Sequence, residues 1–308
     1  MTATNISWTQ EVWNWLTGCD AVSSGCEFCY AMVMAKRLKT QGHPKYQSDG
    51  DPRTSGPGFG VAVHDEVMLA PTSWRIPKRV FVNSMSDVGH PRVPRRALAR
   101  SWAVQALTGR HDYQVLTKRP KRLARILNDP EFVAAVAEEA TDIMANMAPH
   151  RGRWRLNLVE RPTGGGWTTS RTEDGGTLWA PPWPLPNTWV GTTIESDEYS
   201  YRADLLRSTP AAVRWLSIEP MLGPLPSLDL TSIDWVVVGG ESGPQHRHFD
   251  LGWARDIRDR CVEQGIPFYF KQIGGRTTMA NGRQLDGRTW DEYPLAAQRG
   301  SSGTRKSR

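Results

Sequence analysis

Three cysteines lie close together near the N-terminus. Cys19, Cys26 and Cys29 follow the pattern C-x6-C-x2-C, and the fourth cysteine of the chain, Cys261, is remote in the sequence. Three thiolates on one short loop can converge on a single metal centre, whereas a closed zinc site or a fully ligated iron–sulfur cluster takes four protein ligands. The count therefore predicts a metal centre with one open position, where a substrate or cofactor can bind.

Length and composition place this chemistry in a large α/β protein. A chain of 308 residues can form one large domain or two smaller ones. No apolar run approaches the roughly 18 residues of a membrane helix, so we expect no membrane partner. The first residues lack the basic and apolar regions of a secretory signal. Clustered thiols without such a signal predict a cytoplasmic protein that uses its cysteines for metal ligation rather than disulfides.

The positive charge is concentrated in one stretch. The formal net charge is +6, and residues 75–125 contain thirteen Lys or Arg but only two acids, Asp87 and Asp112. Such a basic block favours an anionic partner, with nucleic acid (DNA or RNA) as the first candidate. The alternative is a solvated basic helix face. The chain also has fourteen tryptophans, of which most should pack in the core and some could stack on bases.

Six short runs rich in Val, Ile and aromatic residues are interpreted as buried parallel strands. They cover residues 79–85, 113–118, 188–195, 213–220, 234–242 and 267–272. Helical patterns follow at 94–107, 120–127 and 251–264, the last with Asp250 as its N-cap. On that helix Cys261 shares a face with Trp253 and Ile257, which predicts a buried core thiol.

This alternation predicts an α/β fold in which residues 1–128 and 187–295 form one parallel (β/α) barrel or partial barrel. Residues 129–186 interrupt the pattern and are interpreted as an insertion or lid, with a helix over 131–147 followed by a loop or β-ribbon. Residues 296–308 are small, polar and basic, which predicts a disordered tail.

Polar residues follow the predicted strands, where catalytic residues of such barrels lie. They are Asn83, Ser84, Asp87, Thr117, Lys118, Arg119, Thr192, Thr193, Glu195, Glu219, Glu241, Ser242, Lys271 and Gln272. The cysteine loop also follows an apolar segment, residues 12–16. We therefore expect the loop and the strand ends to meet at one mouth.

The cysteine spacing, with aromatic Phe28 just before the third cysteine, resembles the cluster loop of radical S-adenosylmethionine (SAM) enzymes, although their usual first gap is three residues. The resemblance implies a [4Fe-4S] cluster held by Cys19, Cys26 and Cys29, with SAM on the fourth iron. It also implies an external electron donor, cleavage of SAM to methionine and a 5′-deoxyadenosyl radical, and a full or partial (β/α) barrel.

A second resemblance covers most of the chain. Seven segments, in order, resemble the phage Gp37/Gp68-like family, a domain of unknown function. They are residues 6–19, 29–31, 82–87, 116–120, 217–220, 238–243 and 270–272. The insertion at 129–186 is less similar. This family implies no reaction, so the chemistry is argued from the residues.

The strand-end residues are assigned roles within the SAM hypothesis. The predicted cofactor-binding residues are Asn83, Ser84, Asp87, Thr193, Glu195 and Glu219. The predicted catalytic residues are Lys118, Arg119, Glu219 and Lys271, of which the cations could meet the SAM carboxylate or a substrate phosphate. The alternatives are that Asp87 caps the following helix and that Glu219 and Glu241 are buried partners of Lys or Arg.

The main functional hypothesis is a radical SAM enzyme that modifies or repairs nucleic acid, with or without a partner protein. A second hypothesis is a non-enzymatic zinc module for nucleic-acid binding, in which His43 or His64 completes a Cys3His site. A third is a metal-independent hydrolase that uses Asp87, Glu195 or Glu219, although the sequence lacks an ordered nucleophile–base pattern.

Overall fold

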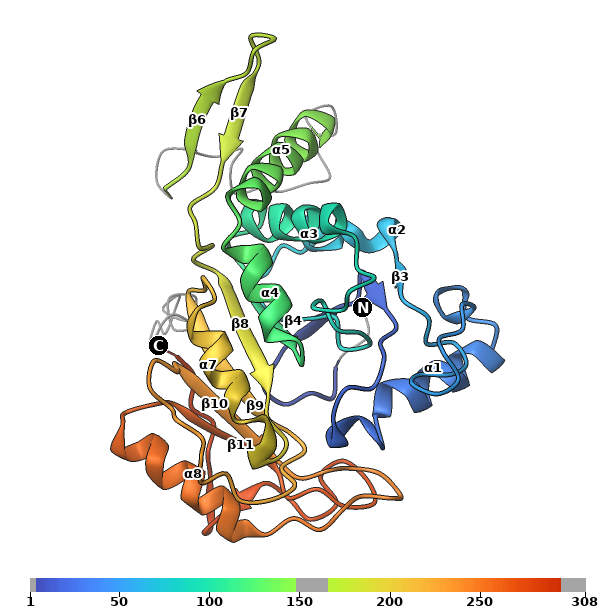
Figure 1. Cartoon of the computed structure of the whole chain (residues 1–308), viewed down its shortest axis with the longest axis vertical. Helices are drawn as coiled ribbons and strands as arrows, with labels where there is room; N and C mark the ends of the chain where they lie inside the picture. Colours follow the sequence, from blue (N-terminus) through green and yellow to red (C-terminus); the bar gives the residue numbers. More distant parts are fainter. Residues whose placement is uncertain (1–3, 148–165, 295–308) are drawn as a thin grey trace, which may run out of the picture.

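The computed structural model describes residues 4–147 and 166–294, and its centre is a seven-stranded parallel sheet that curls into a half-barrel (Figure 1). In spatial order the strands are β1 (Glu11–Trp13), β4 (Arg79–Val82), β5 (Asp112–Thr117), β8 (Thr188–Thr193), β9 (Val213–Ile218), β10 (Trp235–Gly239) and β11 (Phe268–Gln272). Every neighbouring pair is parallel. The six predicted strands and the predicted partial barrel are confirmed.

Short antiparallel pairs surround this sheet. Strand β2 (Leu16–Thr17) leads from β1 into the cysteine loop and pairs with β3 (Ala62–Val63), which lies after that loop in the chain. A hairpin of β6 (Thr168–Arg171) and β7 (Thr177–Ala180) precedes β8. A third pair, β12 (Gln284–Leu285) and β13 (Arg288–Thr289), follows β11.

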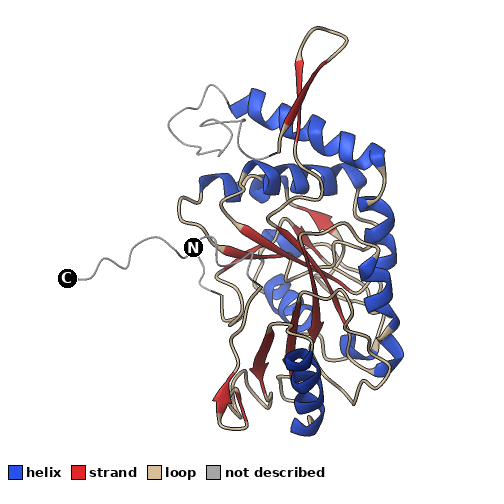
Figure 2. Ribbon diagram, turned by 90° about the vertical axis from the view of Figure 1, so that its left-hand side faces the viewer, coloured by secondary structure: helices blue, strands red, loops and turns tan. Residues whose placement is uncertain are grey.

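Helices flank the sheet and its connecting loops (Figure 2). They are α1 (Tyr30–Thr40), α2 (Asp65–Met68), α3 (Arg95–Leu107), α4 (Pro120–Leu127), α5 (Pro130–Met147), α7 (Tyr201–Arg207) and α8 (Leu251–Glu263). Asp250 caps α8 as predicted, because its side chain accepts a hydrogen bond from the amide of Gly252 at 2.7 Å. Cys261 on the same helix is fully buried, and burial raises its pKa to about 12, which confirms a core thiol.

The concave face of the half-barrel is filled at its base by aromatic rings. Trp8, Trp189, Trp215, Trp235 and Tyr269 are buried there, with neighbouring ring centroids 5.3 to 6.2 Å apart. This aromatic layer closes the base of the half-barrel and leaves the carboxyl ends of the strands for polar chemistry.

Strand alternation then decides which strand-end residues face inward. Successive side chains of a strand point to opposite faces of the sheet. Ile194, Ile218 and Phe270 pack in the core on the helix-covered side. Their neighbours Glu195 and Glu219 must therefore lie on the concave side, above the aromatic layer. The same alternation places Lys271 inward, two residues after Tyr269.

One glycine makes the aromatic layer possible. A Cβ atom on Gly191 in β8 would lie 2.5 Å from the indole ring of Trp215. We expect Gly191→Ala to lower the free energy of unfolding by about 1–3 kcal/mol, as overpacked cores do. Urea unfolding measures this, and Gly223→Ala is the matched control, because a Cβ there meets no atom within 4 Å. Equal stability of the two variants would contradict tight packing at Trp215.

The insertion contains the predicted helix, α5, and a β-ribbon, β6–β7. Helix α5 packs on α3, where Glu139 accepts hydrogen bonds from Arg96 and Arg100, each at 2.8 Å. In Figure 1 the β6–β7 hairpin projects beyond the amino end of β8, away from the cysteine loop. The described part of the insertion therefore does not cover the mouth as a lid. Residues 148–165 and the predicted basic tail, 296–308, lie outside the described residues.

No helix within residues 4–147 and 166–294 is long and apolar enough to cross a membrane.

Candidate functional site

The cysteine loop lies across the carboxyl ends of the strands. After β4, Met85 accepts a backbone hydrogen bond from Gly18 at 3.0 Å. After β8, Glu195 accepts a hydrogen bond from the Ser23 hydroxyl, and beyond β10, Arg247 donates to the carbonyl of Ser24 at 3.0 Å. The structure thus brings the loop and the predicted strand-end residues to one mouth.

Cys26 sits beside a buried charge network. The ammonium group of Lys118 lies 3.6 Å from the Cys26 Sγ atom and forms an ion pair with Glu195. The second oxygen of Glu195 accepts from Arg202 at 2.8 Å, and both of these side chains are almost fully buried. Burial alone would raise the pKa of Cys26, but the Lys118 charge and hydrogen bonds outweigh it, so the pKa is lowered.

Gly25 allows the loop to approach this network. A Cβ atom on Gly25 would lie 2.5 Å from the Cγ atom of Glu195. Since Glu195 is held by Lys118 and Arg202, it has little room to move. Any larger residue at position 25 would push Cys26 away from Lys118.

Cys19 faces a second cation. Arg119 places Nη1 3.3 Å from the Cys19 Sγ atom and 2.9 Å from Asp87. Burial is the largest influence on Cys19 and the Asp87 carboxylate adds to it, so the pKa of this thiol rises to about 12 despite Arg119. Cys19 and Cys29 also pack against a small apolar cluster that includes Phe59.

Asp87 does not cap a helix, which corrects that alternative. Helix α3 begins after Pro94, whereas the Asp87 carboxylate accepts the amides of Gly89 at 2.8 Å and Lys118 at 3.0 Å. With its ion pair to Arg119, Asp87 fixes the turn that carries both cations of the site.

Cys29 is the N-cap residue of helix α1 and is half-buried. Burial raises its pKa, against backbone hydrogen bonds at the start of α1 that lower it. The next residue, Tyr30, donates a hydrogen bond to the carbonyl of Ser84 at 2.6 Å. The third cysteine is therefore anchored to the end of β4.

The thiols are free. Within 4–147 and 166–294, no group of three or more His, Cys, Asp or Glu side chains is placed so that it could hold a metal ion. Ligation would therefore need the three thiols to come closer together. The donor set itself fits an iron–sulfur cluster, because three cysteines share one loop and two cations beside them would offset thiolate charge.

The proposed histidine ligands of a zinc site have other partners. His43 accepts the amide of Lys45 through Nδ1 at 3.3 Å. Nε2 of His64 lies 2.7 Å from the hydroxyl of Thr17. Neither arrangement favours a Cys3His centre.

Glu219 and Lys271 form a second inward pair. Lys271 Nζ lies 3.0 Å from Glu219 Oε1, and Ser217 donates to the other oxygen at 3.3 Å. Glu219 is thus a partner of lysine, as the alternative held, but it is only half-buried. Gly239 makes space for the pair, since a Cβ there would lie 2.8 Å from Glu219 Oε1.

The other predicted cofactor residues lie at the same mouth but have structural partners. Asn83 has a positive φ of 63° and accepts the amide of Leu16 at 3.1 Å, while its Nδ2 atom is buried without a hydrogen-bond partner among the described residues. Ser84 hydrogen-bonds with Asn14 at 3.2 Å. Thr193 is buried, and its carbonyl accepts from Arg202 at 2.8 Å.

Sequence reasoning missed Arg202 and Arg247. Arg247 pairs with Glu241 at 2.6 Å, which confirms the alternative for that glutamate, and its guanidinium lies 5.1 Å from the ring centre of Phe28. It therefore ties the loop after β10 to the cysteine loop. Arg247 follows the segment Gly-Gly-Glu-Ser-Gly after a predicted strand, and this position could have indicated that it lies at the mouth.

A third overlooked cluster surrounds Asp20, next to Cys19. Its carboxylate meets His90 at 2.8 Å, Arg92 at 2.9 Å and Thr54 at 3.0 Å. Burial would raise the pKa of Asp20, but hydrogen bonds from His90 and Thr54 and the Arg92 charge lower it to about 2. This cluster fixes the start of the loop.

The comparisons with known proteins identify a family without assigning an activity. Residues 3–294 match the family model described as "Protein of unknown function (DUF5131)". Because the match spans nearly the whole chain, the protein belongs to this family. The searches of curated proteins and of solved structures found no match. The resemblances to phage Gp37/Gp68-like proteins and to radical SAM enzymes stay predictions.

Proposed function

We propose that this member of the DUF5131 family is an iron–sulfur enzyme of the radical SAM type that acts on nucleic acid, by modification or lesion repair. One observation carries the proposal: a three-cysteine loop lies over the carboxyl ends of a parallel half-barrel, with Lys118 and Arg119 against its thiols. When bound, a [4Fe-4S] cluster would supply the electron for reductive cleavage of S-adenosylmethionine. That electron must come from an external donor.

Within this proposal Cys19, Cys26 and Cys29 ligate the cluster. Their binding requires the thiols to lose protons. Lys118 and Arg119 lower the cost of the thiolate charge because they lie within 3.6 Å of Cys26 and 3.3 Å of Cys19.

The inward strand-end residues would bind SAM. Glu219 is a candidate for the amino group or ribose, and Lys271 for the carboxylate, because this ion pair faces the mouth and can exchange partners. Asn83 has a buried amide nitrogen without a partner among the described residues, so it can donate a hydrogen bond. Glu195 and Asp87 act indirectly, by holding Lys118 and Arg119 beside the thiols.

The protein should be purified and reconstituted anaerobically with iron and sulfide to test the proposal. We expect about four irons per chain, broad visible absorption and a reduced cluster whose EPR signal changes with SAM. One tightly held zinc and no cluster would overturn the enzyme assignment and support the zinc-module alternative. A cluster whose EPR signal ignores SAM would contradict the SAM-binding step alone.

A further inference from the structure

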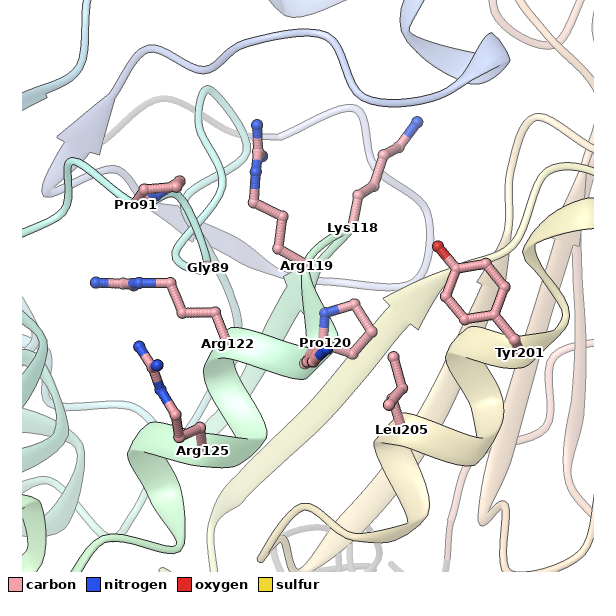
Figure 3. Close-up of a pocket in the computed structure, with 10 residues that line it drawn as sticks. Gly89, Pro91, Lys118, Arg119, Pro120, Arg122, Arg125, Tyr201 and Leu205 are labelled. Carbon is pink, nitrogen blue, oxygen red and sulfur yellow. The ribbon is translucent and has the colours of Figure 1, made fainter.

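A basic pocket adjoins the cysteine site on the outer side of the half-barrel. A cavity of about 790 Å³ lies between the first turns of α4 and α7 (Figure 3). One wall is the basic segment Lys118–Arg125, and the aromatic ring of Tyr201 stands on the other wall. No acidic residue lines this α4–α7 pocket.

Three of its five cations have no ion-pair partner in the described residues. Lys118 and Arg119 are paired with Glu195 and Asp87, whereas Lys121, Arg122 and Arg125 form no ion pair within 4–147 and 166–294. Arg122 donates to the carbonyl of Val93 at 3.0 Å through one nitrogen, while its Nη1 atom is buried without a hydrogen-bond partner.

The pocket gathers three unpaired cations on one short helix, whereas most of the other cations of the basic block have an ion-pair partner. Elsewhere in residues 75–125, Lys78 pairs with Glu11, Arg95 with Asp129, and both Arg96 and Arg100 with Glu139. Burial and the nearby charge of Arg125 lower the pKa of Arg122, so the cations of α4 repel one another. An external anion would relieve both the repulsion and the unmet hydrogen bond.

We propose that the α4–α7 pocket binds the phosphate backbone of a single-stranded nucleic-acid segment and stacks one base on Tyr201. The unpaired cations are spread from the first to the last turn of α4, which suits successive phosphates better than one small anion. Lys121 and Arg125 are neighbours at i and i+4 on the helix surface. Tyr201 is 53% exposed, so its ring can receive a base.

The pocket also connects a bound nucleic-acid strand to the cysteine site, and this link rests on the proposed function. Lys118 and Arg119 line the pocket and contact Cys26 and Cys19. In Figure 3 both side chains extend away from α4, whereas Arg122 and Arg125 point to one side of the pocket. A strand bound along α4 would therefore bring an adjacent nucleotide to the cysteine loop.

Fluorescence anisotropy with labelled single-stranded DNA and RNA of about fifteen nucleotides tests this inference. At about 50 mM salt we expect the full-length protein to bind, and K121A/R125A to weaken binding about tenfold or more. The double variant should also reduce the slope of log affinity against log salt by about 1.4, the value for two phosphate contacts. Tyr201→Ala should weaken binding, and Tyr201→Phe should restore it.

The matched control is R75A/R171A. It removes the same charge from two exposed arginines, one before β4 and one on the β6–β7 hairpin, both away from the mouth. Each variant should show the thermal unfolding of the unmodified protein, because the replaced side chains are exposed. Equal weakening by both double variants would overturn the pocket assignment, since only overall charge would matter.

Two competitors identify the ligand. Unlabelled oligonucleotide should displace the probe, whereas inorganic phosphate and polyglutamate at matched charge should not. Displacement by either of these at the same concentration would overturn the nucleic-acid assignment. Oligonucleotide binding at the pocket needs no iron–sulfur cluster, so this inference and the proposed function can fail separately. A protein that holds iron and responds to SAM but binds no oligonucleotide would contradict the pocket inference. A protein that binds oligonucleotide but holds no iron would contradict the radical SAM proposal.

Discussion

Replacement of Cys19, Cys26 or Cys29 by alanine should reduce the iron of the anaerobically reconstituted protein from about four per chain to nearly none. A cluster held by three thiolates has no spare protein ligand, so loss of one thiolate leaves too few to hold it. Iron analysis and the visible spectrum measure the loss.

Cys261→Ala is the control for this experiment. Cys261 is a buried residue of α8, apart from the cysteine loop, so its loss should leave the iron content unchanged. Circular dichroism and thermal unfolding should show that each loop variant is folded. Full iron retention after loss of Cys26, whose thiol lies beside Lys118, would exclude the three-thiolate centre.

Glu195→Ala should be the most destabilising change at the site, lowering the free energy of unfolding by about 3–5 kcal/mol. Glu195 is fully buried and neutralises two cations, Lys118 and the almost fully buried Arg202. Removal of the carboxylate leaves both charges without their ion-pair partner, and Arg202 is almost fully shielded from water. Urea unfolding of the metal-free protein measures the effect independently of any cluster.

Glu198→Ala is the matched control, because Glu198 is exposed only three residues away and has no ion pair among the described residues. Its stability should stay within about 0.5 kcal/mol of the unmodified protein. Glu195→Gln keeps the shape but not the charge, so it should also be strongly destabilised. A stable Glu195→Gln protein would show that hydrogen bonding, rather than charge, holds Lys118 beside Cys26.

The cysteine variants and the Glu195 variant should have different effects, one on iron binding and the other on the stability of the fold. Loss of a loop cysteine should remove iron from a protein that still folds, since the ion pairs of Glu195 stay intact. Loss of Glu195 should weaken the fold itself, because Arg202 also holds the carbonyl of Thr193 at the end of β8.

The secondary structure was predictable because its signals are local. Runs of Val, Ile and aromatic residues identified six strands of the sheet, and the Asp250 cap identified the start of α8. The first strand, Glu11–Trp13, was identified only as part of an apolar segment, because three residues are too few to show the alternation of apolar and polar side chains that is typical of a strand. Parallel pairing followed from the intervening helices, so a partial barrel could be expected.

The sequence by itself determined which thiols could bind a metal, and it determined that the polar site residues would lie at the carboxyl ends of the strands. The three cysteine positions and the polar residues after each strand are properties of the chain order. Only the tertiary structure decided the partners, because ion pairs form between charges that folding brings together. Ser23 meets Glu195 across 172 positions, and Lys118 reaches Cys26 across 92. No local pattern encodes such contacts, which is why Arg202, Arg247 and the α4–α7 pocket emerged only from the fold.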